Sequence, residues 1–402
     1  MTSQPSRGEF IAMIAMLFAS IAFSIDAMLP ALPELAGQFT PDDPNKAQLV
    51  VTSFVLGMGL GTLFTGPLSD AVGRKPIVLF GASLYIVTAY LATLAPDLET
   101  LLGARFVQGV GAAAPRVVAL AIVRDLYAGR GMARIMSFVM MIFTLVPAIA
   151  PSLGALLINL SGWETIFYAF MFFSAVSALW LWVRLPETLP ADNRRPFRVA
   201  TMTAAMKEVV LHPVVRLCIF VQGLAFGTLF ATISSIQPIY EVTFDKADSF
   251  PTYFAVIALL AMSASYLNSV LVVRIGMRKL VTVMLTAQLA ISAVMVSLLA
   301  IGLPLNVLFV AFLFWQLSLF FQAGLTLGNL NAIAMEPMGH IAGMAASITG
   351  AISTVLAVVL AAPIGLMFDG TPMPLALSVL VLTFGALALM RLMNRIEDRL
   401  PA

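Results

Sequence analysis

The stretch GPLSDAVGRKP, residues 66–76, joins two apolar segments that we place at 47–69 and 76–95. Each segment has about the 20 residues that a helix needs to cross the hydrocarbon core of a bilayer. Gly66 and Gly73 permit the close backbone approach and unusual dihedral angles of a tight turn, and an Arg-Lys pair gives the turn positive charge. We therefore predict two membrane-spanning helices joined by a short basic loop.

The composition extends this prediction to the whole chain. Of the 402 residues, 60% are hydrophobic and 10% are charged, whereas a soluble globular domain carries about 25% charged residues. The polar surface is too small to cover a water-soluble particle. We expect the first apolar stretch to be a retained helix and not a signal peptide, because no small-residue cleavage site follows it.

Few residues are available for metal, cofactor or enzyme chemistry. Cys218 is the only cysteine, and His212 and His340 are the only histidines, so neither a disulfide nor a metal-ligand spacing is present. No G-x-x-x-x-G-K-[ST] loop occurs, so the chain carries no nucleotide motor of its own. We expect no cofactor, no metal site, no nucleic-acid partner and no enzymatic activity.

The hydropathy pattern predicts an all-α membrane protein with twelve transmembrane helices in two six-helix halves. A charged, proline-rich stretch separates the halves and cannot span a bilayer. We expect an N-terminal half at 1–190, a cytoplasmic linker with a short surface helix at 191–212 and a C-terminal half at 213–402. The predicted spans are 10–31, 47–69, 76–95, 99–123, 132–158, 163–184, 214–240, 251–273, 279–301, 304–333, 341–367 and 373–393.

Lysine and arginine lie almost entirely on one side of these spans. Of the 22, Lys46 and Lys246 lie in loops of the other side, and Arg105 and Arg116 lie within a span. The remaining eighteen (22 − 4) lie in the terminal segments, in the linker, in the loops after the second, fourth and eighth spans, or at the span ends next to these segments. The positive-inside rule therefore places both termini and the linker in the cytoplasm.

The basic loop recurs once in the second half of the chain. Gly73-Arg74-Lys75 follows the second predicted span, and Gly276-Met277-Arg278-Lys279 follows the eighth, 203 residues later (276 − 73). Two six-helix halves related by such a repeat are one architecture of secondary transporters. Short basic turns also follow spans simply because they set topology, so this repeat alone is weak evidence for two related halves.

Asp26 is the only acidic residue that we place inside the membrane. It lies about 16 residues into the first predicted span, roughly 24 Å from its inner end. An intramembrane carboxylate is costly to ionise and is a functional-site hypothesis by default. Asp26 is therefore a candidate proton carrier; the alternative is an aspartate near the outer headgroups.

Arg105 and Arg116 lie eleven residues apart in the fourth predicted span. Eleven steps of 100° bring them onto one helical face, about 16 Å apart along the axis. We hypothesise that Asp26 and Arg105 form a pair that protonation of Asp26 releases; the alternative is a static ion pair that fixes helix packing. Arg116 is either an anion-binding group low in a cavity or an arginine that snorkels to the cytoplasmic surface.

Four motifs resemble the major facilitator superfamily, most closely its drug:proton antiporter branch and the bicyclomycin/chloramphenicol resistance (Bcr/CflA) group. They are DAMLPALP at 26–33, the loop at 66–76, RFVQG at 105–109 with AIVRDLY at 121–127, and PAIAPSLG at 147–154. The resemblance implies a proton-coupling role for the acid at position 26. It is specific for fold and branch, and it does not specify the substrate.

Two of these motifs imply conformational roles. In the loop, Asp70 can accept from a helix N-terminus or from an arginine across the seam between the halves, which would bias the transporter toward one facing state. Arg74 and Lys75 belong to the same gating motif, although they also serve as topogenic charges. The last motif supplies helix-bending residues that allow close packing: Pro147, Pro151 and Gly154.

In the second half, no charge lies deep in a predicted span. Most amide and hydroxyl side chains there are expected to join helices. Gln222, Gln237 and Asn329 are our candidates for lining the substrate cavity.

These patterns predict a proton-coupled secondary transporter that exports small drugs or metabolites by alternating access. Two arginines against one acid favour neutral, zwitterionic or anionic substrates over lipophilic cations. The alternative is a proton-coupled carrier for uptake or export of one metabolite. We expect a monomer in the bacterial inner membrane, with a small-molecule substrate, protons and the lipid bilayer as its partners.

Overall fold

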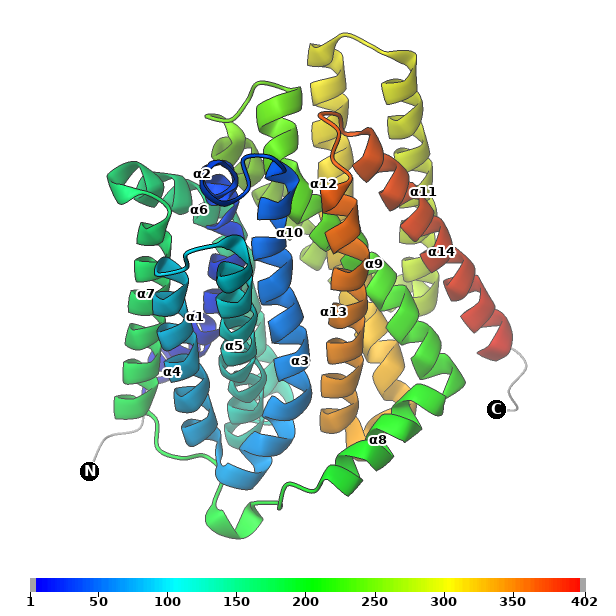
Figure 1. Ribbon diagram of the computed structural model, residues 1–402. Coiled ribbons are helices and arrows are strands. Elements are labelled where there is room, and N and C mark those ends of the chain that lie inside the picture. The colour runs from blue at the N-terminus through cyan, green and yellow to red at the C-terminus, as the bar shows by residue number, and fades with distance from the viewer. Residues whose placement is uncertain (1–4, 398–402) are drawn as a thin grey trace. The chain divides into compact units, whose positions relative to one another are not determined.

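The computed structural model describes residues 5–397, which form helices and no strand (Figure 1). Two short α-helices, α2 (Leu32–Phe39) and α8 (Val199–Leu211), accompany twelve long ones in this part of the chain. The long helices are α1 (Arg7–Asp26), α3 (Leu49–Val72), α4 (Arg74–Thr93), α5 (Leu98–Leu126), α6 (Gly129–Ser161), α7 (Glu164–Arg184), α9 (Pro213–Pro238), α10 (Phe250–Ile275), α11 (Met277–Ile301), α12 (Leu305–Met335), α13 (Ala342–Leu366) and α14 (Met373–Glu397).

The predicted number of spans agrees with these helices. Among the described residues, eleven continuous stretches are long and apolar enough to cross a membrane, and one of them, Leu305–Leu366, has 62 residues. A single crossing takes about 20 residues, so this stretch contains two spans. The short 3₁₀ segment Glu336–Ile341 divides it into α12 and α13, and Met338 has non-helical dihedral angles there. The twelve-span prediction is therefore confirmed.

The first helix ends earlier than predicted. We expected it to continue to residue 31, but α1 ends at Asp26 and a 3₁₀ turn, Leu29–Ala31, follows. Pro30 has no N–H with which to bond the carbonyl of Asp26 four residues earlier, and a proline also disfavours helical geometry in the residue before it. The DAMLPALP motif therefore breaks the helix directly after the acid.

Contacts divide the chain into two units, Met1–Thr203 and Ala204–Ala402. In the N-terminal unit, α5 packs closely against α3 and α4. Glycines make this approach possible: a Cβ at Gly57 would collide with the backbone of Phe106, and one at Gly109 would collide with the carbonyl of Phe54. Close backbone contact at small residues is the usual basis of helix association in membranes.

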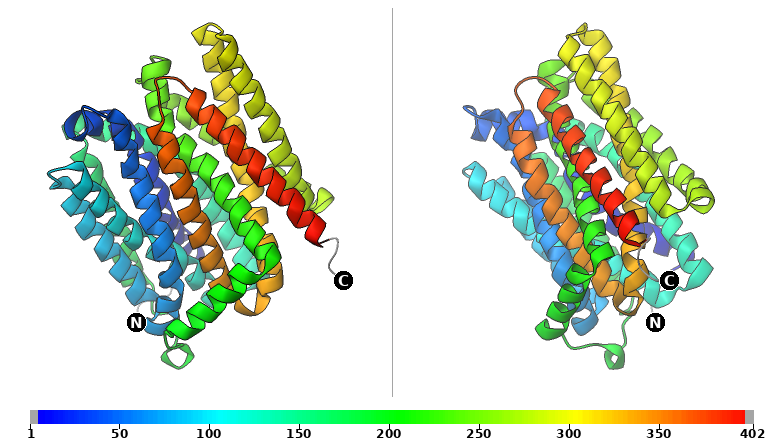
Figure 2. Two further views of the ribbon diagram at one scale, coloured as in Figure 1. Left: turned by 45° about the vertical axis from the view of Figure 1, so that its right-hand side comes forward. Right: turned by 90° about the vertical axis from the view of Figure 1, so that its right-hand side faces the viewer.

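In the C-terminal unit, α9 is the central helix and packs against α12, α13 and α14. Tyr240, just beyond its end, donates to Gln316 Oε1 at 2.8 Å within a cluster that includes the rings of Phe250, Phe309 and Phe312. On the other side of α14 lies α11, and the two helices run side by side in both views of Figure 2. The short helix α8 falls within the predicted linker and spans the division between the units.

Candidate functional site

Asp26 lies at the last residue of α1, in the N-terminal unit, and is 4% exposed. Its carboxyl group makes no hydrogen bond or ion pair with any residue that the structure describes. The negative end of the α1 dipole lies here and opposes a negative charge. An acid in this position has no fixed partner to stabilise its ionised form.

Arg105 is completely buried in the middle of the same unit. Its guanidinium donates to Val50 O at 3.2 Å, to Ser24 O at 3.0 Å and to Gln108 Oε1 at 2.8 Å. The carbonyl of Ser24 is one of the last four of α1, which have no partner within the helix; Met28 N–H bonds to Ile25 O instead. Arg105 therefore satisfies a helix-end carbonyl and places a cation at the negative end of the α1 dipole.

Three aromatic rings enclose the same guanidinium. Its carbon lies 4.4 Å from the centre of the Phe54 ring, 5.7 Å from that of Phe167 and 5.9 Å from that of Phe170. A cation over a ring face is attracted by the ring quadrupole, more strongly where water is excluded. Together with its hydrogen bonds, this cage joins α1, α3, α5 and α7 through one side chain.

The hypothesised ion pair between Asp26 and Arg105 is therefore absent from this structure. Arg105 reaches the end of α1, but it contacts the backbone of Ser24 and not the carboxyl group of Asp26. Side chains two residues apart on a helix point about 200° apart, so the acid extends away from the side on which Ser24 meets its neighbours. The alternative, a static ion pair that fixes helix packing, is likewise absent among the described residues, and Arg105 contacts carbonyl oxygens, an amide oxygen and aromatic rings instead.

Ser24 and Tyr85 complete the buried polar group, although neither was a candidate from the sequence. Ser24 Oγ donates to Ser20 O, and it lies 2.5 Å from the hydroxyl oxygen of Tyr85. Because the Ser24 proton is used on Ser20, Tyr85 is the donor of this second bond. Gln108 Nε2 is buried and has no hydrogen-bond partner among the described residues. Tyr85 was the sequence signal for this group, because a tyrosine hydroxyl that is buried needs a hydrogen-bond partner.

Arg116 has different surroundings from Arg105. The two residues share a face of α5, as the spacing predicts, but the side chain of Arg116 is exposed. It makes no hydrogen bond or ion pair with the described residues. Its role as an anion-binding group stays a prediction.

The loop at residues 66–76 is held by a network of charges within the N-terminal unit. Arg74 is 4% exposed and forms ion pairs with Asp70 and, at 2.9 Å, with Asp125. The carboxylate of Glu187 accepts from the backbone N–H groups of Arg74 and Lys75 at 3.0 Å each. The partner of Asp70 is thus an arginine one turn away. Arg74 holds the loop together through its ion pairs, in addition to any effect of its charge on topology.

Two glycines shape this loop differently. Gly73 has a φ of +120°, which side-chain-bearing residues rarely adopt, and the carboxylate of Glu187 lies beside it. Gly66 lies within α3, and its carbonyl accepts from Ser69 Oγ at 2.8 Å. The unusual dihedral angle predicted for the turn is therefore needed at Gly73. Glu187, from the segment after α7, was not anticipated as part of the network.

The helix-bending motif lies beside the end of α1. Pro147, Pro151 and Gly154 all fall within α6, and a Cβ on Gly154 would collide with the carbonyl of Ala27. Ala27 directly follows Asp26, so the motif contacts the backbone of the residue next to the acid. This contact was not predicted, because the spacing of residues does not give the rotation of a helix.

An apolar groove of about 390 Å³ is lined by residues of α1, α6 and α7 that precede this contact along α1 and α6. Only alanine, methionine, phenylalanine, isoleucine, leucine and valine side chains line it, among them Ala19, Phe23, Ile149, Leu153 and Phe173. Phe23 lies one turn of α1 before Asp26. The acid is therefore adjacent to a surface without hydrogen-bonding side chains.

The three amide candidates lie in the C-terminal unit, and each is 5% exposed. Gln222 Oε1 accepts from Ser353 Oγ at 3.3 Å, and Gln237 Nε2 donates to Glu241 at 2.8 Å. Asn329 Nδ2 donates to Asn268 Oδ1 at 2.7 Å and to Leu325 O at 2.8 Å. These bonds join neighbouring helices or turns, and a role in lining a cavity stays a prediction.

Residues 12–362 match the sequence profile of the Major Facilitator Superfamily. The chain belongs to this family. It is 28% identical over 396 residues to the uncharacterized MFS-type transporter YdgK of Bacillus subtilis, covering 96% of this chain and 97% of the relative. It is 28% identical to a bicyclomycin resistance protein homolog of Haemophilus influenzae, covering 93% of each chain. It is 30% identical to the multidrug resistance protein MdtL of Shewanella oneidensis, covering 81% of each.

Solved structures agree with the family assignment. The crystal structure of a D-xylose–proton symporter superposes with a TM-score of 0.74 at 14% identity, covering 95% of this chain and 97% of the symporter. The structure of the human organic anion transporter MFSD10 superposes with a TM-score of 0.66 at 17% identity, covering 96% of this chain and 100% of the transporter. These likenesses show the fold. The predicted family, its drug:proton antiporter group and the assignment as a transporter and not an enzyme are confirmed, and the protein is a multi-pass membrane transporter.

We expect Arg105→Gln to lower the free energy of unfolding by about 1–3 kcal/mol, because the Ser24 carbonyl and the aromatic cage lose their cation. Asp26→Asn should cost less, at most about 1 kcal/mol, because it removes no bond to a described residue. Thermal unfolding of the purified variants in detergent measures both. Equal destabilisation by the two substitutions would indicate that the residues act as a pair.

Gly154→Val should destabilise the protein by about 1–3 kcal/mol, because the added side chain forces α6 away from the carbonyl of Ala27. Gly131→Val is the matched control on the same helix, since a Cβ there meets nothing within 4 Å. The same thermal assay compares them. A Gly154 variant as stable as the Gly131 variant would contradict the contact between α6 and the end of α1.

Proposed function

We propose that this protein exports small drug-like molecules in exchange for protons, with Asp26 as the residue that carries the proton. The observation that supports this most is the isolation of the Asp26 carboxyl group. It is buried at the break after α1, and Arg105 donates to other acceptors. Relatives that are named for bicyclomycin resistance and multidrug resistance support the direction of transport.

The isolation of Asp26 gives a physical basis for coupling. Protonated Asp26 is neutral and is compatible with its buried position, whereas ionised Asp26 is costly there because no described residue hydrogen-bonds to it or forms an ion pair with it. Proton binding therefore favours the conformation in which the acid is buried, and proton loss favours one in which it is hydrated. A ligand that binds one conformation better shifts the equilibrium toward it, which is the requirement for alternating access driven by protons.

The surroundings of Asp26 favour neutral or anionic substrates. The adjacent groove along α1, α6 and α7 offers apolar contact only. Arg105 and Arg116 outnumber the single acid, so desolvating a lipophilic cation nearby is unfavourable. The exposed guanidinium of Arg116, which has no partner among the described residues, supports a second candidate, a proton-coupled carrier for one acidic metabolite.

The remaining proposals concern the setting of the transporter. The distribution of lysine and arginine supports cytoplasmic termini and a cytoplasmic linker, and we place the protein in the bacterial inner membrane. We propose that it works as a monomer of two six-helix halves, 1–190 and 213–402, joined by the linker at 191–212. Asp70, Gly73 and Arg74 form the network that would change when the transporter switches its facing state.

Drug susceptibility of an efflux-deficient bacterial host tests the proposed function. Wild type should raise resistance to a neutral phenicol or to an anionic compound, and Asp26→Asn should return it to the level of the empty vector at equal membrane expression. The reason is that the amide cannot bind and release a proton.

A quaternary ammonium dye is the control compound, and wild type should give no resistance to it. Resistance that survives in Asp26→Asn would contradict proton carriage by Asp26. Strong resistance to the dye would contradict the substrate class. No resistance to any compound would favour the metabolite carrier.

A further inference from the structure

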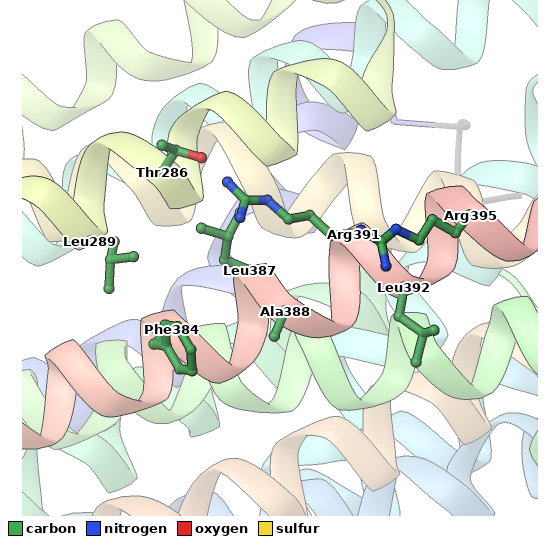
Figure 3. Close-up of a pocket in the computed structure, with 8 residues that line it drawn as sticks. All are labelled: Thr286, Leu289, Phe384, Leu387, Ala388, Arg391, Leu392 and Arg395. Carbon is green, nitrogen blue, oxygen red and sulfur yellow. The ribbon is translucent and has the colours of Figure 1, made fainter.

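A second groove, of about 340 Å³, lies between α11 and α14 in the C-terminal unit (Figure 3). Its sides are mostly apolar and include Leu289 from α11 and Phe384 and Ala388 from α14. At its end lie Arg391 and Arg395. Figure 3 shows both guanidinium groups turned back along α14, with that of Arg391 reaching over Leu387 toward Thr286 of α11.

The exposed face of α14 has the pattern of a helix that faces lipid. Its large exposed side chains recur at helical spacing and are apolar: Leu377, Val381, Phe384 and Leu392, each 43–65% exposed. Arg391 and Arg395 continue this stripe one turn apart. They lie six and two residues before Glu397, hence about 9 Å and 3 Å from the end of the helix. Both arginines therefore lie in the last two turns of the helix, directly after the apolar stripe.

The two arginines are available for a ligand. Both are exposed, and neither forms a hydrogen bond or ion pair with the described residues. Among the described residues, no carboxylate lines the groove. A guanidinium presents several N–H donors in a planar fork that matches phosphate, and two of them one helical turn apart can bind one phosphate group between them.

We propose that this groove binds an anionic phospholipid, with the lipid phosphate on Arg391 and Arg395 and an acyl chain between α11 and α14. Basic pockets between transmembrane helices on the cytoplasmic side are suited to anionic headgroups, and the positive charges of the chain assign this end of α14 to that side. The apolar floor distinguishes the site from a simple attraction between arginines and the membrane surface. The proposal is independent of the transported substrate.

Arginines without a groove offer a matched comparison. Arg130 and Arg134 are also exposed, also one turn apart and at the end of α6 that the charge pattern places in the cytoplasm. They line neither of the grooves described here. If charge alone bound lipid, the two pairs would contribute equally.

Native mass spectrometry of the purified protein with added phosphatidylglycerol or phosphatidylcholine tests the proposal. Wild type should retain phosphatidylglycerol in preference to phosphatidylcholine. The double variant Arg391→Gln/Arg395→Gln should bind it on the order of tenfold more weakly, because two surface cations are lost. The control Arg130→Gln/Arg134→Gln should bind it as wild type does.

Two further measurements separate a built site from charge alone. Ala388→Trp fills the groove and keeps both arginines, and it should also weaken phosphatidylglycerol binding. Soluble glycerol phosphate should not displace the lipid, because it has no acyl chain. Equal loss in the two arginine pairs, unchanged binding in Ala388→Trp, or equal retention of the two lipids would overturn the proposal.

Discussion

The guanidinium of Arg105 is the interaction on which the N-terminal unit depends. A cation in the interior of an apolar bundle must be compensated, and here the compensation comes from two backbone carbonyls, one side-chain amide and three aromatic rings. These partners come from α1, α3, α5 and α7, so satisfying one charge fixes the relative positions of four helices. The glycines that bring α3 and α5 together make this arrangement possible.

The isolation of Asp26 follows from the same arrangement. Arg105 takes the carbonyl of Ser24, the helix stops because Pro30 cannot donate, and Gly154 brings α6 against the next residue. Each step places a constraint on the backbone around the acid and leaves the carboxyl group without a partner. A buried acid without a partner does not stabilise the fold. Its isolation instead suits a group that must gain and lose a proton during the transport cycle.

The sequence was sufficient for the fold and insufficient for the contacts. Hydropathy gives the number and length of spans because crossing a bilayer imposes a length, and loop charges give an expected orientation. Neither gives the rotation of a helix about its axis, which decides that Arg105 meets Ser24 and not Asp26. Pro30 was a sequence signal for the end of α1 at Asp26. The predicted span was extended to residue 31 because the residues up to that point are mostly apolar. Arg74, Asp125 and Glu187 come from three segments, and their network needed the folded chain.

Proton flux in proteoliposomes tests most directly whether Asp26 carries the proton. Vesicles that contain the purified protein and an internal pH-sensitive dye would be given an exported compound on one side, with wild type and Asp26→Asn compared at equal protein content. We expect compound-dependent proton movement with wild type and none with Asp26→Asn, while the variant still binds the compound. Proton movement of equal size in both proteins would contradict the assignment of Asp26 as the proton carrier.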